Sequence, residues 1–193
     1  MDRTNATAIA ALAVAGFATI SWLKCSRAPR IKDSVEVKGC GKVAVTSTRE
    51  KAFAKVTLDW AKIFGKLPPS MAKIPFCSLT VADDGTIHVS GTVGIAPPSS
   101  PDAGPVLVEG GAKAETYRIL ELMEGFLASV GATMADVTMV HCYLADYSVA
   151  NFAEMNAGYL EYFGKKPLPA RITVGCTGLA MGAKVEIDLT AKI

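Results

Sequence analysis

The alternation of polar and apolar residues is clearest near the end of the chain, where it predicts two strands. Residues 171–174 and 184–189 follow a period of two, which is typical of strands with one buried face. Gly178 lies between the two runs, so the pattern favours an antiparallel hairpin that turns close to it. In that hairpin Arg171 and Glu186 lie roughly opposite each other. The sequence therefore predicts a guanidinium and a carboxylate in one small patch.

The middle of the chain adds a second hairpin, two helices and one more strand. Residues 74–93 contain two alternating runs around Asp84-Gly85, which is a strong hairpin signal. Apolar residues three and four apart predict helices over 112–131 and 148–164, and the apolar run 137–146 between them predicts a strand. This order indicates an α+β domain in which two helices cover one face of one sheet. The other face would be bare, and the apolar run favours its burial in an oligomer.

The part of the chain before this domain is less regular. Residues 33–48 contain a short alternating piece interrupted by glycines, which fits either a hairpin or an extended tether. Residues 48–66 carry apolar side chains at helical spacing, and this predicts a short amphipathic helix that Gly65 and the following prolines end. The predicted organisation is a linker over 33–69 and a domain over 70–193.

The most apolar stretch of the chain comes first. Residues 4–23 carry no charge, and a helix over them would span ~30 Å at ~1.5 Å per residue, about the thickness of a bilayer's hydrocarbon core. Four Lys and Arg residues follow this stretch up to position 32, and only Arg3 precedes it. By the positive-inside rule, this charge difference places the domain on the cytosolic or matrix-like side. A signal peptide, a transit peptide and a buried helix compete with this interpretation. Length and flanks favour an uncleaved transmembrane anchor over 1–32.

Charge and cysteine content narrow the classes of function. The net charge of +2 conceals a basic segment over 24–66, with 11 Lys and Arg against 4 Asp and Glu, and an acidic domain from residue 68 onward, with 8 against 13. A domain with a net charge of −5 and no basic cluster lacks the footprint of a nucleic-acid partner. The five cysteines are scattered without a CxxC motif, so no metal site or disulfide framework is expected. His141 and Cys142 are interpreted as core or interface residues, because no third group completes a Cys–His arrangement.

Four short motifs in the last two thirds of the chain resemble one known family. GTIHVSG, NFAEMNAGYLEYF, LPAR and KVEID, in this order over residues 73–193, are similar to the RidA/YjgF family of enamine and imine deaminases. The resemblance implies a chorismate mutase-like sheet with two helices on one face. It also implies a trimer whose sheets face inward, with three sites between subunits.

The resemblance also assigns roles to individual residues. It implies that Arg171 binds the substrate carboxylate and that Glu186 handles a water or a proton. Ser90, Gly91 and Asn156 would supply supporting hydrogen bonds. The remaining two expected binding residues depart from the family, since Phe76 stands where a Tyr is frequent and Thr173 where a Cys is common.

The implied reaction is hydrolysis of 2-aminoacrylate-type intermediates, released by pyridoxal-phosphate enzymes, to 2-oxo acids and ammonia. No cofactor is expected, because an iminium carbon is already electrophilic. A surface salt bridge between Arg171 and Glu186, worth ~0.2–1 kcal/mol, is the structural alternative to a site.

Two alternatives to the enzyme stay open. The first is a non-catalytic accessory subunit that tethers a homo- or heterotrimer to a larger membrane complex, for example a respiratory one. The second is a sensor of small carboxylate ligands. Ribonuclease activity, attributed to members of the family, is disfavoured by the acidic domain. The mitochondrial inner membrane is the preferred location.

Overall fold

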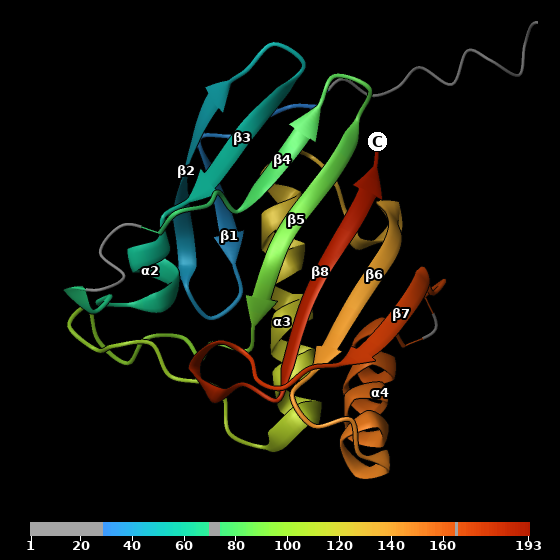
Figure 1. Cartoon of the computed structure of the whole chain (residues 1–193). Helices are drawn as coiled ribbons and strands as arrows, with labels where there is room; N and C mark the ends of the chain where they lie inside the picture. The colour runs from blue at the N-terminus through green and yellow to red at the C-terminus, as the bar shows by residue number, and fades with distance from the viewer. Residues whose placement is uncertain (1–28, 70–73, 165) are drawn as a thin grey trace, which may run out of the picture.

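The computed structural model describes residues 29–69, 74–164 and 166–193, which form one mixed sheet with two long helices on one face (Figure 1). The strands are β1 (Ser34–Val37), β2 (Gly41–Arg49), β3 (Phe53–Leu58), β4 (Leu79–Ala82), β5 (Thr86–Val93), β6 (Val137–Leu144), β7 (Ala170–Gly175) and β8 (Val185–Lys192). The helices are α2 (Trp60–Phe64), α3 (Gly111–Ala128) and α4 (Val149–Phe163), with 3₁₀ turns at Met134–Asp136 and Ala180–Gly182. The strand order is β1-β2-β3-β4-β5-β8-β6-β7, and among these strands only β6 and β7 pair in parallel.

The predicted hairpin at the end of the chain is wrong, because β6 lies between β7 and β8. β7 pairs parallel to one edge of β6, and β8 pairs antiparallel to its other edge. The connection from β6 through α4 to β7 is a crossover of the kind that parallel neighbours need. The loop over residues 176–184 then carries the chain to the far side of β6. Alternation predicts which side chains of a strand are buried and says nothing about which strand lies next to it.

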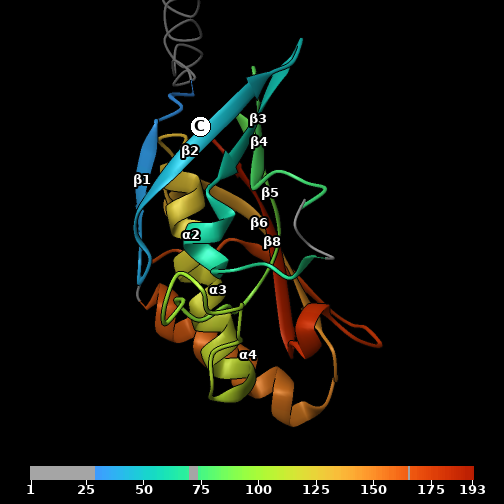
Figure 2. The same cartoon turned by 90° about the vertical axis from the view of Figure 1, so that its left-hand side faces the viewer.

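The two predicted long helices are confirmed, and so is their position on one face of the sheet (Figures 1 and 2). Ser148 caps α4, since its hydroxyl accepts a hydrogen bond from the Asn151 backbone N–H at 3.3 Å. The apolar sides of both helices and the inner face of the sheet form the core, which includes Phe126, Leu144 and Phe163. The α+β class predicted from the sequence is therefore correct.

The other face of the sheet, here called the open face, is polar. In β6 the apolar side chains of Val140, Cys142 and Leu144 are completely buried on the helix side, and His141 and Tyr143 between them lie on the open face. The expectation that the uncovered face of the sheet is apolar was therefore wrong. The run 137–146 has few charged residues, but its apolar members point to one side only.

Residues 33–69 extend the sheet by three strands and are not the predicted linker. β3 buries alternate residues, among them Ala54 and Val56, and this period of two prevails over the helical spacing that the same stretch also fits. Of the predicted amphipathic helix only α2 is helical, where the rings at its two ends stack at 5.0 Å. The hairpin that was one of two alternatives for 33–48 is present as β1–β2.

The β1–β2 hairpin packs against α3 from the side opposite β5 and β8 (Figure 2). The contact is close at Gly125, where an added Cβ would lie 2.9 Å from Val37 Cγ2. Arg118 is buried and donates hydrogen bonds from Nη1 to the Lys38 carbonyl oxygen at 2.6 Å and from Nε to the Ile95 carbonyl oxygen at 2.8 Å. The first bond holds the turn of the hairpin on the helix, and the second holds the segment after β5.

None of the helices in the described segments is long and apolar enough to cross a bilayer. The apolar residues 4–23 of the predicted anchor lie outside the described residues. The anchor therefore stays a prediction from the sequence.

Candidate functional site

Arg171 is half-buried on β7 and is held by three side chains of α4. Its Nη2 donates to Asn156 Oδ1 at 2.6 Å, and its Nη1 lies 3.7 Å from Met155 Sδ. The guanidinium carbon lies 4.7 Å from the centroid of the Tyr159 ring, within cation–π distance. A guanidinium has five N–H donors in a fixed fork, so these contacts leave donors for a planar acid group. Asn156, the polar residue on a predicted apolar stripe, thus has a specific partner.

Two buried hydroxyls belong to the same part of the molecule. The hydroxyls of Tyr159 and Thr173 have no hydrogen-bond partner within the described residues. Thr173 shares a face of β7 with Arg171, because residues two apart on a strand point to the same side. Burial raises the pKa of Tyr159 to about 12, so its hydroxyl stays protonated at neutral pH. We call Arg171, Asn156, Tyr159 and Thr173 the arginine cluster; buried polar groups of this kind normally bind water or a ligand.

Cys142 lies on β6 directly beside Thr173 of β7. Burial raises the pKa of its thiol to about 11, so the thiolate needed for nucleophilic attack is scarce at neutral pH. The prediction that Cys142 is a core residue is confirmed.

Glu186 lies on the open face of β8, next to the backbone of β5. A Cβ added at Gly91 would lie 2.3 Å from Glu186 Oε1, so the carboxylate occupies the space that a side chain at position 91 would fill. The pairing of β5 with β8 is irregular between Val89 and Thr92, and such bulges redirect side chains beside functional sites. Burial raises the pKa of Glu186, and the nearby charge of Asp188 raises it further. A carboxylate with a raised pKa is a better base near neutral pH.

Ser90 and Phe76 are the other two predicted site residues on this side of the sheet. Ser90 precedes Gly91 in the irregular part of β5, and its hydroxyl donates to the Cys77 carbonyl oxygen at 2.8 Å. Phe76 is exposed, and its ring meets the Trp60 ring edge-on at a centroid distance of 6.0 Å. Both residues line one cavity. Gly91 lies against Glu186, and Ser90, the residue before it, shares a cavity with Phe76; we call these four residues the glutamate cluster.

The arginine cluster and the glutamate cluster lie on opposite faces of the sheet. Arg171 pairs with Val140, which is buried on the helix side, whereas Glu186 pairs with Tyr143 on the open face. The prediction that Arg171 and Glu186 share a patch was wrong, because it depended on the hairpin. The seven predicted site residues therefore form two groups, and a site that uses both key residues of one chain is excluded.

Sequence reasoning missed a hydrogen-bonded group on the open face beside Glu186. Asp188 accepts from His141 Nδ1 at 2.6 Å and from the Tyr143 hydroxyl at 2.9 Å. The second bond raises the pKa of Tyr143. His141 and Tyr143 are two apart in sequence, as are Glu186 and Asp188, but only the pairing of β6 with β8 reveals that they meet. No group of three His, Cys, Asp or Glu side chains in the described part of the chain is arranged to hold a metal.

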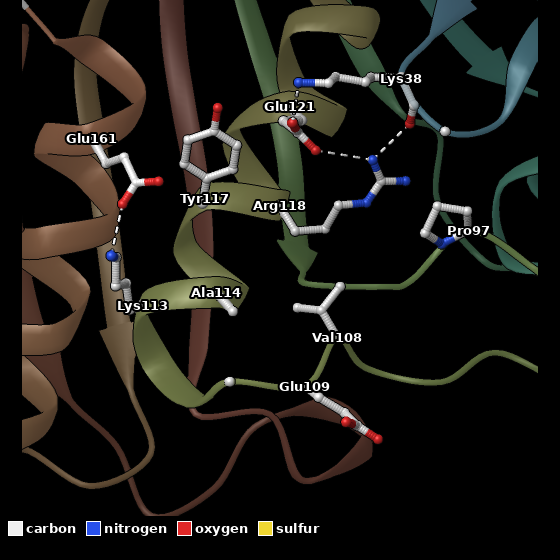
Figure 3. Close-up of a pocket in the computed structure, with 12 residues that line it drawn as sticks. Lys38, Pro97, Val108, Glu109, Lys113, Ala114, Tyr117, Arg118, Glu121 and Glu161 are labelled. Carbon is white, nitrogen blue, oxygen red and sulfur yellow. Dashed lines mark hydrogen bonds and ion pairs between the residues drawn. The ribbon is translucent and has the colours of Figure 1, made fainter.

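A cavity of about 630 Å³ lies on the helix side, beneath the turn of the β1–β2 hairpin (Figure 3). Five of the six charged side chains that line it form ion pairs: Lys38 Nζ lies 2.6 Å from Glu121, Lys113 Nζ lies 2.7 Å from Glu161, and Arg118 bonds Glu121 at 3.3 Å. None of the predicted site residues lines this cavity. The Lys38 pair joins the hairpin to α3 and the Lys113 pair joins α3 to α4, so these charges hold elements together, and we place the candidate site at the two clusters.

Comparison with known proteins gives a consistent set of relatives. The model of the family described as endoribonuclease L-PSP matches residues 68–193. A Rid-family protein of Yersinia pestis, YyfA, is 28% identical, with a TM-score of 0.54 over 63% of this chain and 90% of that chain. A Thermotoga maritima protein described as a candidate endoribonuclease is 30% identical, with a TM-score of 0.53 over 63% and 89%. RidA of an Antarctic Psychrobacter is 26% identical, with a TM-score of 0.53 over 63% and 92%.

Proposed function

We propose that this chain, which belongs to the endoribonuclease L-PSP (RidA/YjgF) family, hydrolyses enamines and imines of the 2-aminoacrylate type to 2-oxo acids and ammonia. The observation that carries the proposal is the arginine cluster. Within the described residues no carboxylate lies within 4.0 Å of the Arg171 guanidinium, which is held by an amide, a thioether and a ring. A half-buried guanidinium without its own counter-ion favours an acid group from a ligand.

The proposed site requires two copies of the chain, because one chain separates Arg171 from Glu186 by the thickness of the sheet. β7 is an edge strand, and its side chains Ile172 and Val174 are 47% and 39% exposed. An unpaired edge with exposed apolar residues favours a contact with another chain. A second copy seated there would bring its glutamate cluster to the first copy's arginine cluster. The oligomer we propose is a homo- or heterotrimer, the form that the family resemblance implies.

In this site Arg171 binds the substrate carboxylate through two parallel N–H···O bonds, which holds the imine carbon beside Glu186 of the second copy. Glu186 takes a proton from a water, whose oxygen attacks the imine carbon while the C=N π electrons move to nitrogen. The nitrogen takes up that proton, which gives a carbinolamine with an amino and a hydroxyl group on one carbon. The hydroxyl proton then passes through Glu186 to the amino nitrogen, the carbon–oxygen double bond forms, and the carbon–nitrogen bond breaks to release ammonia. One imine and one water give one 2-oxo acid and one ammonia, and an enamine enters after tautomerising to the imine.

The other predicted binding residues have supporting roles in this proposal. Asn156 orients the guanidinium through the hydrogen bond already present. The buried Thr173 hydroxyl offers a donor or acceptor to the bound acid group. On the other side, the missing side chain of Gly91 leaves the space that the Glu186 carboxylate occupies, while Ser90 shapes the bulge and the exposed ring of Phe76 packs on the substrate.

The test is a coupled assay with a threonine dehydratase, in which release of 2-oxobutanoate is followed. Wild-type protein should accelerate the release, and Arg171→Ala and Glu186→Gln should each abolish the acceleration. Arg49→Ala and Glu161→Gln, which remove an arginine and a glutamate outside both clusters, are the matched controls and should keep it. If the wild-type protein does not accelerate the release of 2-oxobutanoate, the proposed enzymatic activity is refuted.

Mixing the two inactive variants tests the position of the site between copies. When Arg171→Ala and Glu186→Gln chains are denatured together in equal amounts and refolded, random assembly pairs an intact arginine with an intact glutamate in about a quarter of the sites. Activity should return to about that fraction of refolded wild type. An inactive mixture beside an active refolded wild type would contradict a site shared between chains.

Ribonuclease activity, after which the family is described, has less support in this chain. Residues 68–193 carry 13 acidic and 8 basic residues, which disfavours a phosphate backbone as a partner. RNA incubated with the protein under the conditions of the imine assay should stay intact.

Attachment to a membrane is a separate proposal, supported by the uncharged residues 4–23. The location we favour is the mitochondrial inner membrane, with the domain on its matrix-like side. An accessory role in a larger complex is the alternative to the enzyme. After mild detergent extraction, migration as a lone oligomer with imine-hydrolase activity supports the enzyme, and migration with a large complex without that activity supports the accessory role.

A further inference from the structure

A hydrogen-bonded pair of His141 and Asp188 lies on the open face next to the proposed base. His141 Nδ1 lies 2.6 Å from Asp188 Oδ1, and the two side chains are 36% and 29% exposed. The other carboxylate oxygen, Oδ2, accepts from the Tyr143 hydroxyl at 2.9 Å. Both oxygens of Asp188 thus have donors on β6, which fix the carboxylate in one orientation. The proposed mechanism gives none of these three residues a role.

Strand pairing places this pair close to Glu186. Asp188 follows Glu186 by two residues on β8, so the two carboxylates lie on the same face, ~7 Å apart along the strand. His141 pairs with Asp188 and Tyr143 pairs with Glu186, which puts His141 on the diagonal to Glu186 at ~7–8 Å. These separations are within the Debye length of ~8 Å at physiological ionic strength. A change of charge at His141 or Asp188 therefore changes the electrostatic potential at Glu186.

The other ionisable groups of this face are neutral, farther away or already paired. The bond to Asp188 raises the pKa of Tyr143, so its hydroxyl stays neutral. β5 contributes His88, which lies opposite a residue four positions from Glu186 along β8. β8 contributes Lys192, whose Nζ lies 2.8 Å from an aspartate of the β4–β5 turn, and β7 contributes apolar side chains beside β6.

The charge of the imidazole decides what Glu186 meets. Histidine is the side chain that commonly changes charge between ~pH 5 and 8. Because Nδ1 of His141 donates to the carboxylate, the proton that changes the charge binds at Nε2. With a neutral ring, Asp188 presents an uncompensated negative charge to Glu186. With a charged ring, the pair as a whole is neutral, and the repulsion between the two carboxylates is largely cancelled.

We propose that His141 is a positioning residue for the proposed base: it fixes Asp188 beside Glu186 and, in its charged form, cancels the charge of Asp188, so that Glu186 stays ionised as the pH falls. The inference rests on the proposed function. A carboxyl group ionises more readily beside a cation and less readily beside an anion. Removing the charge of His141 should therefore move the protonation of Glu186 to higher pH, and removing that of Asp188 should move it to lower pH.

The test measures kcat/KM for imine hydrolysis against pH in wild type and His141→Gln. An amino-acid oxidase supplies the imine from L-alanine, semicarbazide traps what is not hydrolysed, and the rate in buffer is subtracted at each pH. The Gln amide keeps a donor for Asp188 but cannot become charged. Its acid limb should lie higher by roughly half a pH unit, as expected for an ion ~7–8 Å away in a partly exposed pair. His141→Gln/Asp188→Asn should lie between the two single variants.

His88→Gln is the matched control. His88 is the other histidine of the chain and also lies on the open face, where its Nδ1 is 3.3 Å from Thr190 Oγ1. Thr190 is four residues from Glu186 along β8, ~13 Å, which exceeds the Debye length. His88→Gln should therefore leave the acid limb unchanged. The Arg171 guanidinium of the neighbouring copy in the proposed site is the same in all variants, so its charge cancels in the comparison.

A second measurement needs no turnover. In protein labelled with ¹³C at the glutamate side-chain carboxyls, the Glu186 signal is assigned by its loss in Glu186→Gln. Its change with pH reports the protonation of Glu186 directly. The variants should follow the same order as in the kinetic profiles, with His141→Gln highest and Asp188→Asn lowest.

Two results would overturn the inference in distinguishable ways. If His141→Gln lowers kcat/KM at every pH without moving the acid limb, or if His88→Gln moves it equally, His141 only supports the fold, although the proposed function stands. If no imine is hydrolysed faster than in buffer, the proposed function fails and takes this role with it. The carboxyl titration then shows separately whether His141 controls the ionisation of Glu186.

Discussion

Glu115 of α3 is a buried carboxylate that holds the start of β8, and its removal should weaken the fold and the glutamate cluster together. Its Oε2 accepts hydrogen bonds from the backbone N–H groups of Lys184 at 2.8 Å and Val185 at 3.0 Å. Glu115 is 4% exposed, so water has little access to it. Val185 immediately precedes Glu186 in the chain. Glu115→Ala would leave both N–H groups without their acceptor.

The expected loss follows from these contacts. An unsatisfied buried donor costs ~1–3 kcal/mol, and the Lys184 N–H belongs to an exposed residue that can gain water, so we expect a total of ~2–4 kcal/mol. For a chain of this length that corresponds to a fall in Tm on the order of 10 °C. Glu115→Gln keeps a carbonyl oxygen as acceptor and should lose clearly less stability than Glu115→Ala. It should still lose some, because a neutral hydrogen bond is about half as strong as a charge-assisted one.

Urea and thermal unfolding of the three proteins, at one protein concentration because oligomers gain stability by mass action, measure the effect. The imine assay well below the lowest Tm then shows whether Glu186 is also displaced in Glu115→Ala. A free energy of unfolding within 0.5 kcal/mol of wild type, the usual range for surface substitutions, would show that these two bonds do not hold β8.

Two further predictions concern the glutamate cluster. Because burial and the charge of Asp188 raise the pKa of Glu186, the base should become protonated, and kcat/KM should fall, at a higher pH than for an ordinary glutamate. Asp188→Asn lowers that pKa and should move the acid limb of the pH profile to lower pH; an unmoved limb would contradict the assignment of Glu186 as the base. Gly91→Ala places a Cβ on the flexible end of Glu186, so kcat should drop by an order of magnitude or more while stability changes by less than ~1 kcal/mol. Equal kcat in Gly91→Ala and wild type would show that the position of this carboxylate is unimportant.

The helices and the central strands could be predicted from the sequence because their signals are local. The spacing in α3 and α4, the Ser148 cap and the alternation in β8 each arise within a single element. The contact of Asn156 was also within reach, since a polar residue on an apolar stripe needs a partner, although the sequence could not show that the partner is Arg171.

The arrangement of the strands could not be predicted in the same way, since pairing depends on crossovers that leave no mark in a strand's own pattern. The alternating residues of β7 fit β6 as a neighbour as well as they fit β8. Because β7 was paired with β8 in the prediction, Arg171 was placed on the same face as Glu186, which is the wrong face. The error in β3 has a different origin. Its apolar residues fit both a period of two and a helical spacing, and pairing with β2 and β4 decides between them.

The enclosure of α3 between the β1–β2 hairpin and the sheet should govern how the protein opens. Most residues of this helix are buried, including Ile119, Leu122 and Phe126, and the hairpin closes the side that would otherwise face solvent (Figure 2). Amide protons in the middle of α3 should therefore exchange with deuterium only when the whole domain unfolds, whereas those of α2 should exchange through local opening. By covering α3, strands β1 and β2 thus make the opening of this helix as slow as the unfolding of the whole domain.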